Sequence, residues 1–200
     1  IVRQICPIQG SVYLFCPPMR LVPVLLIVAI AAGAWNHFSA RPVDHAAGIL
    51  APDDPVQIDR SGLPAFSVAG YRITPAATFS LQARVLSTEA YHAGREADLS
   101  PVDLALGWGP MSDSAVLDRL QISQGNRFYF YRWSGAPPIP PVDIVEHSAN
   151  MHMIPANDDI KRRLGTVRAG QIVALGGYLV RVQAPDGWHW NSSMTRSDSG

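Results

Sequence analysis

Residues 171–196, QIVALGGYLVRVQAPDGWHWNSSMTR, decide the expected fold. Apolar and β-branched residues lie on either side of two breaks, Gly176-Gly177 and the Pro-Asp-Gly of residues 185–187. Gly-Gly suits a two-residue hairpin because both positions can adopt positive φ, and Pro-Asp-Gly suits a turn that contains a left-handed glycine. The block therefore predicts three antiparallel strands joined by two tight turns.

Two earlier stretches also predict strands. In TFSLQARVLS, residues 78–87, apolar residues at every second position indicate a strand with one buried face. NRFYFYRW, residues 126–133, alternates aromatic rings and indicates a strand with both faces partly covered. Residues 39–70, by contrast, are interrupted by Pro, Asp and Gly without a sustained period, which predicts a linker.

Short helices are expected between these strands. Ser100 before Pro101, with an acidic residue in the first turn, predicts a helix that ends at Gly107. Two more are expected, one after a cap at Ser112 or Asp113 and one from Asp158 to Leu164, capped by Asn157 and closed by Gly165. The predicted fold class is mainly β, with α+β as the alternative. We expect a small antiparallel barrel or rolled sheet with two or three short helices over residues 71–200, behind an N-terminal transmembrane or signal segment.

The composition excludes several classes of protein. The chain has 200 residues, of which 48% are hydrophobic and 16% charged, with no net charge. The balance of charges argues against a nucleic-acid partner, and the apolar content argues against disorder. The 17 prolines and 16 glycines favour short elements and exclude a helix bundle.

The N-terminal part has the order of a targeting segment. Arg20 precedes LVPVLLIVAIAAGAW, residues 21–35, so a charged residue is followed by an apolar core and small residues. We interpret Met19 as the natural start and residues 1–18 as an N-terminal extension, with a cytoplasmic tail as the alternative. Arg20 favours a cytoplasmic N-terminal side, which places the C-terminal domain in the periplasm behind a single pass of the inner membrane.

The segment at residues 19–38 can be a cleaved signal peptide or a retained signal anchor. Ala32-Gly33-Ala34 fits the small-x-small pattern of a cleavage site. Fifteen apolar residues reach only about 22 Å, against roughly 30 Å of hydrocarbon, but interfacial residues up to Phe38 extend that reach to about 27 Å. We favour the anchor. Cys6 and Cys16 both precede the segment, so the exported part has no thiolate ligand and no internal disulfide.

The densest polar cluster is His147-Ser148-Ala149-Asn150-Met151-His152. Histidines five residues apart share neither a strand face nor a helix face, so only a loop would let both reach one metal. The candidate residues are His147, Asn150 and His152, with His189 from the C-terminal block as a fourth. We interpret them as hydrogen-bonded side chains that fix a loop, and we predict neither a metal nor another cofactor.

A Ser/Lys pair is the other catalytic possibility. Lys161 is the single lysine of the chain, and Ser148, Ser192 or Ser193 would be its nucleophile. An anchor followed by a β-domain looks like the layout of membrane signal peptidases. However, Asn150 stands where that family has its serine, and Gly170-Gln171 replaces its glycine-aspartate. A solvated helix face around Lys161 explains this stretch better.

Three stretches carry a second resemblance, namely LSPVDLALGWGPMSD (residues 99–113), HSANMHMIPA (147–156) and WHWNSSMTRSDSG (188–200). Over roughly Met19 to Gly200 they resemble an uncharacterised family of membrane-anchored proteobacterial proteins. The family has no established activity, so the resemblance implies a location and no mechanism. It also implies that related chains continue past Gly200 with a short cysteine-containing strand.

Together these observations predict a membrane-anchored extracytoplasmic protein that binds or scaffolds another component of the cell envelope. Its expected partners are the membrane and another envelope protein, and no nucleic acid is expected. The alternative is an envelope hydrolase that uses the His147/His152 region, either with a metal or through a Ser/Lys pair. Convergence of the four candidate residues in a cleft would favour the hydrolase.

Overall fold

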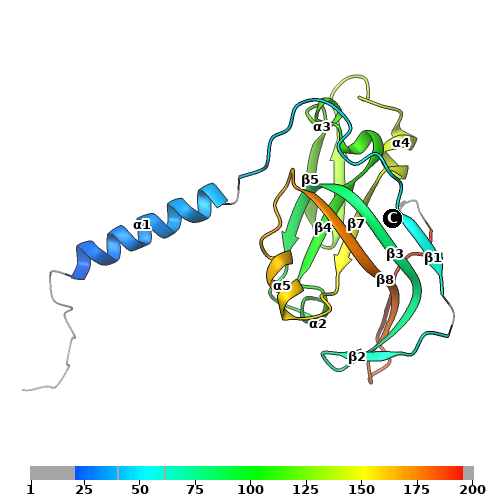
Figure 1. Ribbon diagram of the computed structural model, residues 1–200. Coiled ribbons are helices and arrows are strands. Elements are labelled where there is room, and N and C mark those ends of the chain that lie inside the picture. Colours follow the sequence, from blue (N-terminus) through cyan, green and yellow to red (C-terminus); the bar gives the residue numbers. More distant parts are fainter. Residues whose placement is uncertain (1–20, 40, 61, 196–200) are drawn as a thin grey trace, which may run out of the picture. The chain divides into compact units, whose positions relative to one another are not determined.

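The computed structural model describes residues 21–39, 41–60 and 62–195 (Figure 1). The chain forms two compact units, one up to Ala40 and one from Arg41 onward. The first contains helix α1, Leu21–Ser39, which covers the predicted apolar segment. Among the described residues, no helix is both long and apolar enough to cross a membrane.

The second unit is mainly antiparallel β, as predicted. Its main sheet has seven strands and curls into half of a barrel (Figure 1). The strands of this sheet are β1 Val56–Asp59, β2 Phe66–Val68, β3 Tyr71–Ala90, β4 Val102–Gly107, β7 Ser148–Met153, β8 Ile172–Gln183 and β9 His189–Asn191. A separate two-stranded sheet consists of β5 Gln121–Gly125 and β6 Phe128–Arg132.

Strand β3 organises the main sheet. The strand order is β7-β4-β3-β8-β9, and β1 and β2 both pair with β3 as well. Its register shifts between Pro75 and Ala77 against β8, and between Val85 and Ser87 against β4. Irregularities of this kind bend a strand and increase its twist, which explains how one 20-residue strand serves both walls of the curl.

Short helices occupy the connections between strands. They are α2 Arg95–Leu99, the 3-10 turn η1 Gly109–Ser112, α3 Ser114–Leu117, α4 Pro141–Glu146 and α5 Asp158–Leu164. Two predicted caps are confirmed: Asp113 accepts a hydrogen bond from the Ala115 N–H, and Asn157 accepts one from the Ile160 N–H. Side chains from β3, β4 and α5 share the largest apolar cluster, which includes Leu81, Leu104 and Leu164.

The predicted helix at residues 100–107 is wrong, because this stretch forms strand β4. All six residues of β4 are buried, and it lies between β3 and β7. A strand covered on both faces has a nearly continuous apolar run, which periodicity alone does not distinguish from a short buried helix. The Ser-Pro-x-Asp signal was therefore overridden by tertiary pairing.

The predicted hairpin turn at Gly176-Gly177 is also wrong. Both glycines lie within β8, where Gly176 pairs with Ser80 and Gly177 with Phe79, and neither has a positive φ. Because β3 continues along the whole length of β8, the pairing runs straight through the glycines. The second predicted turn is confirmed, since Gly187 has a φ of 90° between β8 and β9.

Two further stretches differ from their predictions. Within residues 39–70, predicted as a linker, β1 and β2 add strands to β3, and the Ala51 side chain is completely buried. The polar cluster at residues 147–152, predicted as a loop, lies mostly in strand β7. Both corrections have one cause, namely that β3 and β4 offer strand edges that a local sequence pattern does not reveal.

Candidate functional site

A buried carboxylate, Asp103 on β4, is the centre of the candidate site. Its side chain has no exposed surface, and its cross-strand partners are Glu89 on β3 and His152 on β7. Arg127 Nη1 lies 2.6 Å from Asp103 Oδ1, and His152 Nδ1 lies 3.0 Å from Oδ2. We refer to five residues as the Asp103 cluster: Tyr91, Asp103, Arg127, Asn150 and His152.

The ion pair with Arg127 explains why a carboxylate can occupy this strand. An isolated buried carboxylate is strongly unfavourable, whereas one that is paired and hydrogen-bonded is tolerated. Arg127 is 18% exposed, so the pair is largely shielded from water. The contact between His152 Nδ1 and Asp103 Oδ2 is close but lacks the geometry of a hydrogen bond. Arg127 is therefore the principal partner of Asp103.

Arg127 reaches Asp103 from the turn of the β5–β6 hairpin. Asn126 and Arg127 form this turn with φ values of 53° and 69°. The Arg127 guanidinium lies 3.7 Å from the ring centroid of Tyr91. The backbone N–H of Arg127 donates a hydrogen bond to the Tyr91 hydroxyl at 2.9 Å. Two non-glycine residues at positive φ are unusual, so these contacts stabilise an otherwise unfavourable backbone conformation.

Burial raises the pKa of the Tyr91 hydroxyl above its ordinary value, and this effect exceeds the opposing hydrogen bond from the Arg127 N–H. The neutral phenol is therefore the form that accepts this bond. On the other side of the cluster, the ring of Trp190 lies 4.8 Å from that of His152 and 5.7 Å from the Arg127 guanidinium. Strand β9 thereby contacts the same arginine as β4.

Asn150 fastens the hairpin a second time. Its Nδ2 donates a hydrogen bond to the Arg127 carbonyl at 2.9 Å, and its Oδ1 accepts one from Gln124 Nε2 at 2.7 Å. Asn150 and His152 are two residues apart on β7, so both side chains project from the same face of the strand. This face contacts the hairpin.

The other two predicted histidines lie elsewhere. His147 ends α4, where its Nδ1 lies 2.8 Å from the Asp143 carbonyl. Its ring packs against Gly109, because a Cβ at that position would lie 2.7 Å from His147 Cδ2. His189 is exposed on β9 and pairs with Gln183. The structure thus brings His152 and Asn150 together and places His147 and His189 in separate contacts.

The serines proposed as nucleophiles make other hydrogen bonds. Ser148 Oγ is buried and donates to the Ile144 carbonyl at 2.6 Å, and Ser192 Oγ accepts from the Val180 N–H at 2.9 Å. Ser193 Oγ lies 2.8 Å from Thr195 Oγ1. Within the described part of the chain, no hydrogen bond or ion pair joins Lys161 to any of these serines.

Metal coordination would require several ligands in one place. Residues 21–39, 41–60 and 62–195 contain no group of three or more His, Cys, Asp or Glu side chains that could hold a metal ion. In the Asp103 cluster, the Asp103 carboxylate is instead paired with the guanidinium of Arg127. The arrangement therefore fixes the position of the β5–β6 hairpin against β4 and β7.

Sequence analysis did not identify Asp103 or Arg127 as site residues. A signal was present, since Asp103 is a single acid within the apolar stretch PVDLALGW, residues 101–108. An acid in a buried strand requires a cation nearby. The sequence could not tell which arginine supplies it.

No protein-family model, curated protein or solved structure matches this chain.

Proposed function

We propose that residues 41–200 form a binding module of the cell envelope and that the β5–β6 hairpin is its recognition surface. The observation that carries this proposal is the exposure of two phenylalanines on a hairpin that is braced from behind. Phe128 is 59% exposed and Phe130 is 53% exposed, although the Asp103 cluster holds the turn beside them.

The hairpin has two distinct faces. Along β6, exposed and half-buried residues alternate, so Tyr129 and Tyr131 point inward while Phe128, Phe130 and Arg132 point outward. Tyr131 packs against the apolar cluster formed with α3 and α4. The rings of Phe128 and Phe130 are 6.4 Å apart. Aromatic and arginine side chains of this kind are enriched at the centres of protein interfaces.

Bracing favours binding because a rigid surface loses less conformational entropy when a partner docks. The hairpin is fixed by the ion pair at its turn and by the Asn150 hydrogen bonds. Its outward side chains therefore have a defined position before any partner arrives. A partner that covered both phenylalanines would gain apolar burial without ordering the loop.

The proposed location rests on the N-terminal sequence. Arg20 followed by the apolar residues 21–35 supports a single inner-membrane anchor with residues 41–200 in the periplasm. Alkaline phosphatase fused after Gly200 should be active, whereas a fused fluorescent protein that requires the cytoplasm should be dark. The reverse pattern would contradict the topology.

Site-specific photocrosslinking in intact cells tests the recognition surface. A photoreactive phenylalanine analogue in place of Phe130 should yield a discrete crosslinked species. The matched control is the same analogue at Tyr178, an aromatic residue that is 51% exposed on β8. If no crosslinked species forms from either Phe130 or Tyr178, or if both positions give the same species, the hairpin is not the recognition surface.

A hydrolase centred on His152 is the second candidate function. His152 Nδ1 lies 3.0 Å from Asp103 Oδ2 without a hydrogen bond between them. A small rotation of the imidazole ring would form that bond, and a buried carboxylate bonded in this way orients a catalytic histidine. His152→Gln should then abolish hydrolysis of an activated ester while the protein remains folded. Equal hydrolysis by wild type and variant would exclude His152 as its base.

A further inference from the structure

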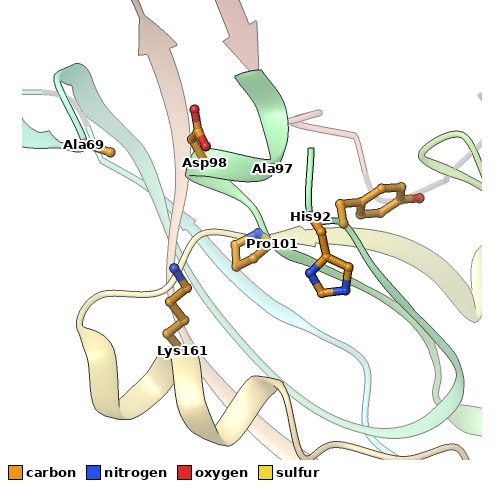
Figure 2. Close-up of a pocket in the computed structure, with 7 residues that line it drawn as sticks. Ala69, His92, Ala97, Asp98, Pro101 and Lys161 are labelled. Carbon is orange, nitrogen blue, oxygen red and sulfur yellow. The ribbon is translucent and has the colours of Figure 1, made fainter. Parts of the chain in front are cut away.

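An open cavity of about 520 Å³ lies between α2 and α5 (Figure 2). This volume is within the range of small-molecule sites. The residues that line the cavity are Ala69, Tyr91, His92, Ala97, Asp98, Pro101 and Lys161. They come from four segments: the β2–β3 turn, the stretch after β3, α2 with the residue before β4, and α5.

The charged side chains of the cavity have opposite signs and come from different helices. Asp98 extends from α2 and Lys161 from α5, as Figure 2 shows. Both are exposed, and no ion pair joins them in the described part of the chain. Each charge is therefore available to a ligand rather than neutralised by the other.

Besides the exposed His92, the remaining lining residues are three short apolar side chains and Tyr91. Ala69, Ala97 and Pro101 contribute short apolar side chains, which leave room between the two charges. Tyr91 is held by its hydrogen bond from the Arg127 N–H and by the guanidinium over its ring. Tyr91, a member of the Asp103 cluster, therefore contributes a fixed side chain to this wall.

We propose that this cavity binds a small zwitterion, specifically a short peptide with a free amino group and a free carboxylate. For a purely anionic ligand the attraction of Lys161 is opposed by the repulsion of Asp98, and for a purely cationic ligand the roles are reversed. A ligand with one charge of each sign is attracted by both walls, and its short side chains contact the alanines and the proline. Neither Phe128 nor Phe130 lines this cavity, so the site extends the proposed function to a second ligand.

Saturation-transfer NMR with L-alanyl-L-alanine and the full chain in a mild detergent tests this assignment. Lys161→Gln and Asp98→Asn should each raise the Kd about two- to fivefold, as expected for exposed ion pairs. The matched control is Arg162→Gln on α5, since Arg162 pairs with Asp159 and does not line the cavity. That variant should keep the wild-type Kd.

Capped dipeptides, each lacking one of the two charges, show which charge of the ligand each protein side chain recognises. N-acetyl-alanyl-alanine should bind more weakly than the free dipeptide, and Asp98→Asn should not weaken it further. Alanyl-alanine amide should bind more weakly too, and Lys161→Gln should not weaken it further. No saturation transfer from the free dipeptide, or equal Kd values for free and capped dipeptides, would overturn the proposal. Photocrosslinking from Phe130 tests the hairpin surface separately, so its result does not depend on whether the dipeptide binds.

Discussion

Two pairs of residues, Gly176-Gly177 and Asn126-Arg127, contrast what local sequence favours with what the fold requires. The glycines can adopt positive φ at little cost, yet they lie within β8 in extended conformation. Asn126 and Arg127 are less suited to positive φ, yet they form the tight turn of the β5–β6 hairpin. Tyr91 and Asn150 hold the backbone of this turn, and Asp103 holds the side chain of Arg127. At Gly176 and Gly177, by contrast, an added Cβ would meet nothing within 4 Å.

The largest effect on stability is expected when the ion pair between Asp103 and Arg127, which holds the Asn126-Arg127 turn, is removed. Asp103→Asn leaves the guanidinium of Arg127 without its counter-charge in a largely buried position. The free energy of unfolding should fall by about 2–4 kcal/mol. Urea unfolding monitored by tryptophan fluorescence measures this change.

The control for this variant is Asp186→Asn, which breaks the exposed ion pair with Arg95. It should leave the denaturation midpoint within error of wild type. Equal losses in both variants would mean that the Asp103 pair contributes no more than a surface pair.

Valine substitutions compare the two glycine breaks of the C-terminal block. Gly187→Val forces a β-branched residue to a φ of 90° and should cost about 1–3 kcal/mol. Gly177→Val should be neutral or stabilise the protein by about 0.5 kcal/mol, because a Cβ there meets nothing within 4 Å and valine favours strands. Thermal unfolding of the two variants compares their stabilities. A greater loss of stability for Gly177→Val than for Gly187→Val would favour a turn at Gly176-Gly177 and contradict a continuous β8.

A smaller gain is expected at Asn126, where φ is 53°. Asn126→Gly should raise the free energy of unfolding by a few tenths of a kcal/mol, because glycine adopts this conformation without the steric cost of a Cβ. Double-mutant analysis with Asp103→Asn sharpens the comparison. If the Asp103–Arg127 ion pair holds Asn126 in an unfavourable backbone conformation, Asn126→Gly should stabilise the Asp103→Asn variant more than it stabilises the wild type.

The smallest effect concerns alkaline pH. Because the pKa of Tyr91 is raised above 10.0 in the folded protein, its contribution to stability is complete below pH 10.0 and is lost as the pH rises through the folded pKa. Tyr91→Phe should therefore lose less stability than wild type between pH 9 and pH 11, although its stability at pH 8 is lower. If wild type and Tyr91→Phe lost the same amount of stability between pH 9 and pH 11, the pKa of Tyr91 would not be raised by folding.

Local signals predicted the elements whose stability is local. Helix α5 was predicted with its bounds, because Asn157 and Gly165 mark its ends in the sequence. The alternation at residues 78–87 located the middle of β3, since one face of that stretch is buried. The Pro-Asp-Gly turn was also predicted correctly, because the positive φ that this turn requires is adopted by Gly187 without help from distant residues.

Elements that depend on distant partners were missed. Strand β4 has a helix-start signal at Ser100-Pro101, and only its place between β3 and β7 makes it a strand. The same limitation applies to the site. His152 was predicted as a candidate residue, but its neighbours Asp103 and Arg127 reach it through pairing of β4 with β7 and through the hairpin turn.

The pairing of β3 with β8 has a consequence for how fast the domain folds. Strands β3 and β8 pair from Arg72 opposite Gln183 to Arg84 opposite Ile172, although about half of the domain lies between them in the chain. Contacts between residues so far apart must overcome a large loop-closure entropy before they stabilise anything, which slows folding. During synthesis, β3 and β4 emerge long before β8, so the side of β3 that β8 will cover stays an open strand edge until β8 itself has been synthesised.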